Sequence, residues 1–145
     1  MRAIDVVADA NVALKWFHAE GEEEVGPARA LLAGHRAGRV ALAVLDLTAY
    51  ELGNALLSGR LGVSATGVAD VLDALAVICP SISPTSEDRR EAAMLAEDHD
   101  LTFYDATYAA VARRRAAQLI TLDGELLRTG LGRRPSDLAA ELPQP

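Results

Sequence analysis

The sequence predicts an α/β fold in which helices cover both faces of a parallel sheet, and two observations support this prediction. Short segments at 4–7, 40–45 and 119–122 are rich in the branched apolar side chains typical of buried strands. Ala- and Leu-rich segments of helical length separate these runs, so strands and helices alternate along the chain. An all-helical fold is the main alternative because alanine is abundant, but it explains the runs at 40–45 and 119–122 poorly.

Each element can be placed from local signals in the chain. The predicted strands lie at 4–7, 40–45, 77–82 and 119–122, with Pro80 interrupting or ending the third. The predicted helices begin near residue 11 or cover 23–35, 47–62, 64–75, 86–100, 105–116 and 137–142. A short segment at 101–104 leads to Asp105, and no clear final strand follows Gly130.

The helix starts are predicted from capping residues. Asp46, Ser64, Thr85 or Ser86, and Ser136 each precede a helical segment. The acidic run at 22–24 is predicted to lie in the first turn of its helix, where carboxylates interact favourably with the helix dipole.

Composition limits the class of protein. The chain has 145 residues, half of them hydrophobic, which suits a single folded domain over residues 1–145 with residues 136–145 as a short helix and tail. We expect no membrane span and no secretory signal, and the single cysteine, Cys79, fits a reducing cytoplasm. The net charge of −7 does not indicate a general nucleic-acid binder, although the basic run 113–115 leaves local contact with RNA open.

Four carboxylates fall where the predicted fold can bring them together. Asp9 and Asp123 follow strands, Glu51 lies within a helix, and Asp105 opens another helix. In a doubly wound sheet such elements can meet at one edge, near the switch point of the strand order. Taken singly, each Asp is more often a cap or a solvated loop residue, and Glu51 is equally well explained by a structural salt bridge.

Convergence of the four acids would require either protonation or a bound cation. At about 5 Å and an effective dielectric near 20, each like-charged pair repels by roughly 3 kcal/mol. Protonation or a bound cation must relieve that repulsion, and all-oxygen ligands favour Mg²⁺ or Mn²⁺. One or two such ions could activate water and stabilise a phosphoryl oxygen, which predicts hydrolysis of phosphodiester bonds.

Other chemistries find little support in the sequence. A receiver-type phospho-acceptor needs a lysine near a late strand, but Lys15 is the only lysine. A phosphatase of the haloacid-dehalogenase type needs an acid two places after the first Asp, where this chain has Asn11. The three histidines lack metal-ligand spacing and are predicted to be surface residues, and Cys79 is predicted to be a small buried apolar residue.

Four segments carry the acids in order along the chain: DANVALKWF with Asp9, TAYELGNAL with Glu51, FYDATYAAVA with Asp105, and LITLDGELL with Asp123. Together they resemble the PIN domain, specifically the VapC-type toxins of bacterial type II toxin–antitoxin systems. The resemblance covers Val6 to about Leu127 and implies a three-layer α/β/α sandwich around a parallel sheet. It also implies a metal-dependent endoribonuclease that inhibits growth.

The resemblance further implies roles for individual residues. Asp9 and Asp105 would be direct ligands of Mg²⁺ or Mn²⁺, and Glu51 and Asp123 would complete the site directly or through water. Asn11 and Thr121 would orient a metal-bound water, although the family often has Ser or Thr where this chain has Asn11.

Partners are implied in the same way: an RNA substrate, a VapB-like antitoxin that occupies the active groove, and a second copy in a homodimer. Trp16 and Phe17 belong either to that groove or to the core, with at least one expected in the core. Arg113, Arg114 and Arg115 would grip RNA phosphates or simply form a solvated helix end. The alternative to an enzyme is a non-catalytic PIN-fold module that binds antitoxin or nucleic acid.

Overall fold

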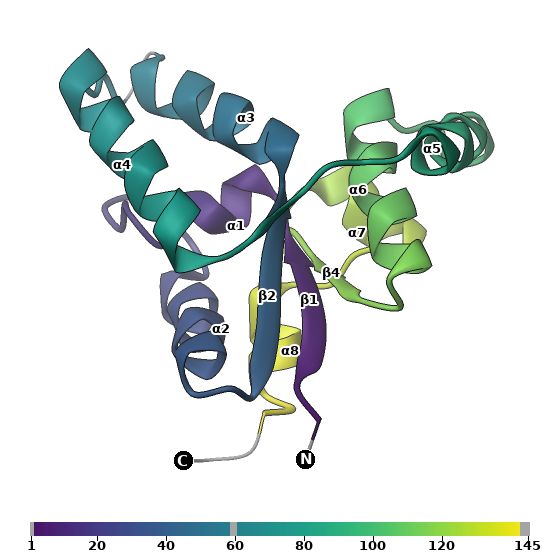
Figure 1. The fold of residues 1–145 in the computed structure, drawn as a ribbon, viewed down its shortest axis with the longest axis horizontal. Helices are drawn as coiled ribbons and strands as arrows, with labels where there is room; N and C mark the ends of the chain where they lie inside the picture. The colour runs from purple at the N-terminus through teal and green to yellow at the C-terminus, as the bar shows by residue number, and fades with distance from the viewer. Residues whose placement is uncertain (1, 59–60, 143–145) are drawn as a thin grey trace.

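The computed structural model describes residues 2–58 and 61–142, and its described strands form one parallel sheet (Figure 1). The strands are β1 (Ile4–Ala8), β2 (Val40–Leu45), β3 (Ser81–Ile82) and β4 (Gln118–Ile120). Their order across the sheet is β3-β2-β1-β4, so β1 lies between the second strand and the last. The chain moves outward from β1 to β2 and β3, then crosses back to place β4 on the other side. The switch point of the sheet therefore lies beside β1.

Helices cover both faces of this sheet, which confirms the predicted three-layer α/β/α arrangement. One layer contains α1 (Ala10–Leu14), α2 (Val25–Arg36), α3 (Asp46–Leu57), α4 (Ala65–Ile78) and α8 (Pro135–Ala139). The other layer contains α5 (Ser86–His99), α6 (Phe103–Arg114) and α7 (Gly124–Thr129). Figure 1 shows α1 to α4 on the left of the strands and α5 to α7 on the right.

The core is divided in two by the sheet. Val6 and Ala8 of β1 pack with the α1–α4 layer, whereas Val7 between them packs with the α5–α7 layer. Successive side chains of a strand point to opposite faces, so a central strand must be apolar on both. This explains why Val6, Val7 and Ala8 are all apolar, and it fixes the position of the C-terminal end of β1, where Asp9 follows.

The third predicted strand is mostly wrong. Val77 and Ile78 belong to the last turn of α4, which continues past the predicted end at residue 75, and the strand is only Ser81–Ile82. Pairing with β2 starts at Pro80, whose carbonyl accepts from the Val44 N–H. An apolar run alone cannot distinguish a strand from a buried helix end.

Two predicted helix starts are also corrected. Asp46 is the first residue of α3 rather than its cap, and the Thr48 hydroxyl accepts from the Leu45 N–H at 3.1 Å. Asp105 is the third residue of α6, because Phe103 and Tyr104 already belong to that helix. The Ser64 and Thr85 caps are confirmed. Helix α3 ends at Leu57, and residues 59–60 of its predicted range lie outside the described residues.

The acidic run at 22–24 lies before α2, not in its first turn. The Glu24 carboxylate accepts from the N–H and the hydroxyl of Ser136, at 2.9 and 2.8 Å. The side chain of Glu22 is buried and pairs with Lys15 at 2.5 Å. Helix α8 begins at Pro135, so Ser136 lies inside this helix and is not its cap. The acidic run connects the loop before α2 to α1 through Lys15 and to α8 through Ser136.

Beyond β4, a single residue, Arg133, continues the edge of the sheet. Within the described part, no strand element follows Gly130, but Arg133 forms an isolated parallel bridge with Ile120. Its carbonyl accepts from the Thr121 N–H, and its own N–H donates to the Leu119 carbonyl, both at 2.9 Å. The predicted tail at 143–145 lies outside the described residues. No helix among the described residues is both long and apolar enough to cross a bilayer.

Candidate acidic site at the carboxyl end of the sheet

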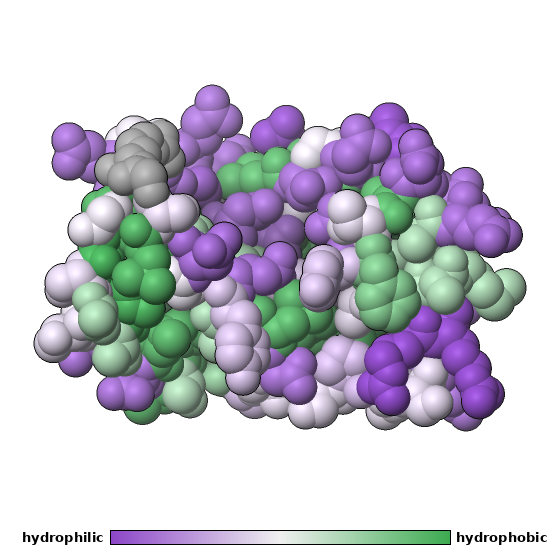
Figure 2. All heavy atoms as spheres, turned by 90° about the horizontal axis from the view of Figure 1, so that it is seen from above, coloured by the Kyte–Doolittle hydropathy of each residue, from purple (hydrophilic) through white to green (hydrophobic). Residues whose placement is uncertain are grey.

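A cavity of about 250 Å³ opens at the carboxyl end of β1, between α1, α3 and α6. Its polar lining consists of Asp9, Asn11, Glu51, Asp105, Tyr108 and Asp123. The view in Figure 2, from above the orientation of Figure 1, shows hydrophilic residues gathered near the centre of this face. The structure therefore brings all four predicted acids to one pocket.

Asp9 is the most deeply buried of the four acids, with 5% of its surface exposed. It caps α1, where one oxygen accepts from the Val12 N–H at 3.3 Å, and the other accepts a short hydrogen bond from the Thr121 hydroxyl. Burial, with a smaller contribution from the charges of Glu51 and Asp105, raises the pKa of Asp9 from its ordinary value of 3.8 to about 7, although its two hydrogen bonds act in the opposite direction. This carboxyl is therefore poised to gain or lose its proton near neutral pH.

Glu51 reaches the pocket from the second turn of α3. The Tyr108 hydroxyl, which comes from α6, donates to Glu51 Oε1 at 2.8 Å. Burial is the main cause that raises the pKa of Glu51, and the charge of Asp105 adds to it. The predicted alternative of a structural salt bridge finds no support, because no ion pair to Glu51 occurs in the described part of the chain.

Asp105 and Asp123 complete the lining from the other layer. Asp105 lies in the first turn of α6, and burial together with the charge of Asp123 raises its pKa. Asp123 caps α7, where its Oδ1 accepts from the N–H groups of Glu125 and Leu126 at 2.9 and 3.0 Å. Asp123 thus acts as a cap and also lines the pocket.

Asn11 and Thr121, the two predicted supporting residues, connect β1 and α1 to the loop after β4. The Asn11 side-chain oxygen accepts from the Leu122 N–H at 3.1 Å. The Thr121 hydroxyl donates to Asp9 and accepts from the Asp123 N–H at 2.9 Å. Both side chains therefore position the acids, and their role in orienting a metal-bound water stays a prediction.

The pocket suits a hard divalent cation in its chemistry. Its lining carboxylates offer oxygen only, and three of them have raised pKa values, as expected where negative charges crowd in a partly dry site. Among the described residues, no three His, Cys, Asp or Glu side chains are arranged so that they could hold a metal ion as they stand. The donor set fits the ion in type, but its oxygens do not form a closed coordination shell.

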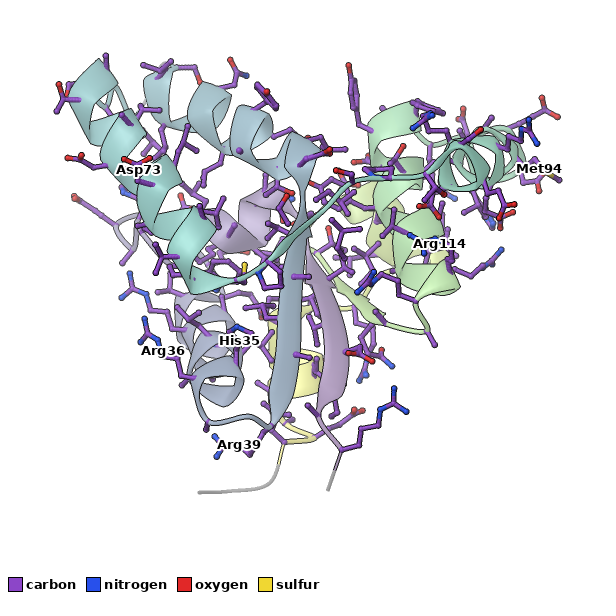
Figure 3. All side chains as sticks on the ribbon, in the orientation of Figure 1. His35, Arg36, Arg39, Asp73, Met94 and Arg114 are labelled. Atoms are coloured by element: carbon purple, nitrogen blue, oxygen red, sulfur yellow. The ribbon has the colours of Figure 1, made fainter. Side chains whose placement is uncertain are left out.

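The basic run lies away from this pocket. Arg114 is at the end of α6, roughly 13 Å along the helix from Asp105 at 1.5 Å per residue, and Figure 3 shows it in the lower part of that helix. Its guanidinium donates to both oxygens of Asp88 on α5, at 2.6 and 2.9 Å, while Arg113 pairs with Glu91 at 2.8 Å. These contacts favour the helix-end interpretation, and an RNA role for 113–115 stays a prediction.

Substitution of Arg114 by alanine should lower the free energy of unfolding by about 2 kcal/mol, because it leaves the buried Asp88 carboxylate without its partner. The matched control is Arg113→Ala, whose exposed pair with Glu91 should contribute less than about 1 kcal/mol. Urea unfolding monitored by circular dichroism measures both. An unchanged midpoint for Arg114→Ala, combined with weaker RNA binding, would instead assign this arginine to the substrate.

The remaining predicted candidates have structural environments. Trp16 is buried and its indole N–H donates to the Ala28 carbonyl at 3.0 Å, which confirms its place in the core, and Phe17 packs beside it partly buried. Cys79 is buried, as predicted. The three histidines are half-buried rather than on the surface, and the His35 ring accepts from the Leu42 N–H.

Tyr108 and Thr48 were not singled out in the sequence. Tyr108 lies in an Ala-rich helix, where an aromatic residue is most simply a core residue, and Thr48 resembles an ordinary helix-start residue. Their hydroxyl oxygens lie 2.6 Å apart, and the Tyr108 hydroxyl donates to Glu51, which is 57 residues earlier in the chain. The available sequence signal was that Tyr108 lies three residues after Asp105 and therefore on the same side of the predicted helix.

Comparison with known proteins agrees with the geometry. A family model described as the PIN domain matches residues 6–131. Exonuclease VapC9 from Pyrobaculum aerophilum is 40% identical over 95 residues, covering 61% of this chain and 67% of that protein.

Solved structures are similar along almost the whole chain. The structure of PAE2754 from Pyrobaculum aerophilum has 26% identity and a TM-score of 0.68, covering 95% of this chain and 94% of that one. VapC20 from Mycobacterium tuberculosis, described as a toxin that cleaves the sarcin–ricin loop, has 18% identity and a TM-score of 0.68 over 86% of this chain and 95% of that one. A toxin–antitoxin complex from Klebsiella pneumoniae has 17% identity and a TM-score of 0.64, with coverages of 90% and 97%. At these last two identities the likeness concerns the fold alone. The chain belongs to the PIN domain family, and its predicted resemblance to the VapC-type members of that family is confirmed.

Proposed function

We propose that this chain is a single PIN domain that acts as a VapC-type toxin, a metal-dependent endoribonuclease. One observation carries the proposal: four carboxylates from separate elements line one pocket at the switch point of the sheet. The raised pKa values of three of them support it, because a protein would gain nothing in stability from such crowding. The similarity to a protein named as an exonuclease supports nuclease chemistry in general.

Mg²⁺ or Mn²⁺, as one or two ions, is the proposed cofactor. Asp9 and Asp105 would hold it directly, and Glu51 and Asp123 would do so directly or through water. When bound, such an ion lowers the pKa of a coordinated water and stabilises negative charge on phosphoryl oxygen. Mg²⁺ commonly keeps several of its waters, so a pocket whose carboxylates do not yet form a closed shell is compatible with it.

The chain itself contributes orientation and charge. Thr121 and the Val12 N–H hold the Asp9 carboxylate at the end of β1, and Asn11 fixes the loop that carries Thr121 and Asp123. Because these groups are already hydrogen-bonded, little side-chain reorganisation is needed at the moment of reaction. In this scheme no protein side chain becomes a covalent intermediate.

The proposal predicts that purified protein, freed of any antitoxin, cleaves a circular single-stranded RNA in the presence of Mg²⁺ or Mn²⁺. A circle has no ends, so its cleavage distinguishes an endonuclease from the exonuclease activity named for the relative. EDTA should stop cleavage and an excess of Mn²⁺ should restore it. Degradation of linear RNA alone would make the protein an exonuclease, and activity in EDTA would exclude the metal mechanism.

A VapB-like antitoxin and a second copy of the chain are the proposed partners, in the cytoplasm. The toxin–antitoxin complex among the similar structures supports the first of these through a shared fold only. An antitoxin arginine would suit the acidic pocket, because guanidinium groups pair well with carboxylates. Co-expression with the product of a neighbouring small reading frame should give a complex that no longer cleaves RNA.

A further inference from the structure

A chain of buried hydroxyl groups connects the end of β2 to Glu51. The Leu45 N–H donates to Thr48 Oγ1 at 3.1 Å, and the Thr48 and Tyr108 hydroxyls lie 2.6 Å apart. The Tyr108 hydroxyl then donates to Glu51 Oε1 at 2.8 Å. Thr48 and Tyr108 are 0% and 1% exposed, so this chain is shielded from solvent until it reaches the pocket.

The direction of the chain follows from its donors. A tyrosine hydroxyl has one proton, and here that proton is directed to the Glu51 carboxylate. Tyr108 can therefore only accept from Thr48, whose own oxygen accepts the backbone N–H of Leu45. Each donor in the series points toward Glu51, so the carboxylate is the end point of the whole chain.

Packing alone does not require the last of these bonds. The Tyr108 hydroxyl would be satisfied by its contact with Thr48, and the Tyr108 ring fills the core whether or not Glu51 is present. The bond to Glu51 instead fixes the rotation of a half-buried carboxylate. Oε1 is engaged by it, whereas Oε2 has no hydrogen-bond partner in the described part of the chain.

We infer that Tyr108, supported by Thr48, is a positioning residue that holds Glu51 with Oε2 available to a divalent cation in the pocket. The inference rests on the proposed function, because it assigns the fixed carboxylate to the metal. It differs from that function in naming groups that never touch the ion. Groups that orient a metal ligand in this way typically change metal affinity when they are removed.

The test is Mn²⁺ binding by isothermal titration calorimetry, independent of any activity. Tyr108→Phe should raise the Kd for Mn²⁺ by roughly ten-fold, the lower end of what loss of such an outer partner usually costs. In a Glu51→Ala background the same substitution should change the Kd by less than about two-fold, because no carboxylate remains to be positioned. This double-mutant cycle separates positioning from a general effect on the fold.

Two matched controls remove a hydroxyl without reaching Glu51. Tyr50→Phe alters an 81% exposed tyrosine that precedes Glu51 on α3, and Thr107→Val removes a buried hydroxyl that donates to the Phe103 carbonyl. Both should bind Mn²⁺ as tightly as the unmodified protein. Thr48→Val gives a second route to the same result: it should weaken Mn²⁺ binding, and Thr48→Ser should restore it by returning the hydroxyl.

The outcomes are distinguishable. If the unmodified protein binds no Mn²⁺, both the proposed function and the positioning role are overturned. If it binds Mn²⁺ and Tyr108→Phe binds equally well, only the positioning role is overturned. An equal loss in Tyr108→Phe and Thr107→Val, or an undiminished loss in the Glu51→Ala background, would also overturn it by showing that the effect comes from the fold.

Discussion

Asp9→Asn should abolish RNA cleavage and also stabilise the metal-free protein at pH 8. The first effect follows because a neutral amide is a weaker cation ligand than a carboxylate, and metal catalysis contributes several kcal/mol, so the rate should fall by at least about a hundred-fold. The second follows because, above pH 7, the buried carboxyl must carry a charge that its surroundings disfavour.

The size of the stability gain can be bounded from the pKa of Asp9. It rises from 3.8 to about 7 in the folded protein, and at about 1.36 kcal/mol per pKa unit this corresponds to about 4 kcal/mol at pH 8. The amide makes weaker hydrogen bonds with Val12 and Thr121, which offsets part of that gain, so we expect about 2 kcal/mol net.

Urea unfolding in EDTA at pH 8 measures the gain, and the circular RNA assay measures the loss of activity. Asp73→Asn is the matched control, because Asp73 is an exposed aspartate on α4 and should change neither quantity (Figure 3). Asp9 would lose its proposed role if Asp9→Asn were less stable than the unmodified protein and cleaved RNA at the same rate. Replacing a residue that serves only the fold is not expected to raise stability and lower RNA cleavage at the same time.

The unmodified metal-free protein should become less stable as the pH rises from about 4 to about 7. Asp9 binds its proton more tightly when folded than when unfolded, so the folded state holds more protons in this range, and raising the pH favours unfolding. Glu51 and Asp105 have raised pKa values and act in the same direction. Asp88 has a lowered pKa, so its contribution is lost only at more acidic pH, below its ordinary value.

Saturating Mn²⁺ should oppose this trend. A cation binds the ionised carboxylates, so its stabilising effect grows with pH and reaches about 2.7 kcal/mol at one hundred times its Kd, which offsets part of the loss. Thermal unfolding at pH 5, 6, 7 and 8, with Mn²⁺ or with EDTA, gives two curves that should diverge. Parallel curves would mean that the ion does not bind these carboxylates, and Asp9→Asn should flatten the EDTA curve.

Much of the fold could be predicted because β1 and β2 are apolar on both faces and are bounded by clear changes in composition. The strand at 77–82 could not, since Val77 and Ile78 suit either a strand or the end of α4 by their side chains alone. The acidic run at 22–24 was misplaced for a different reason. Glu24 in this run accepts a hydrogen bond from Ser136, which lies 112 residues away, and no local sequence signal identifies such a contact.

The candidate site shows the same division. Asp9 and Asp123 follow strands whose ends the sheet must bring together, so their meeting was predictable from topology. Tyr108 was not, because its role depends on how α3 and α6 face one another, and that geometry is fixed by packing rather than by either helix alone. The arginines at the end of α6 looked available for RNA until α5 placed Asp88 and Glu91 beside them.

The strand order has a consequence for the timing of synthesis. β4 inserts beside β1 although more than one hundred residues separate them, and Thr121, which follows β4, holds the Asp9 carboxylate. A nascent polypeptide still short of residue 121 lacks both that hydroxyl and the last acid of the pocket, Asp123. The proposed centre can therefore be completed only after most of the polypeptide has been translated.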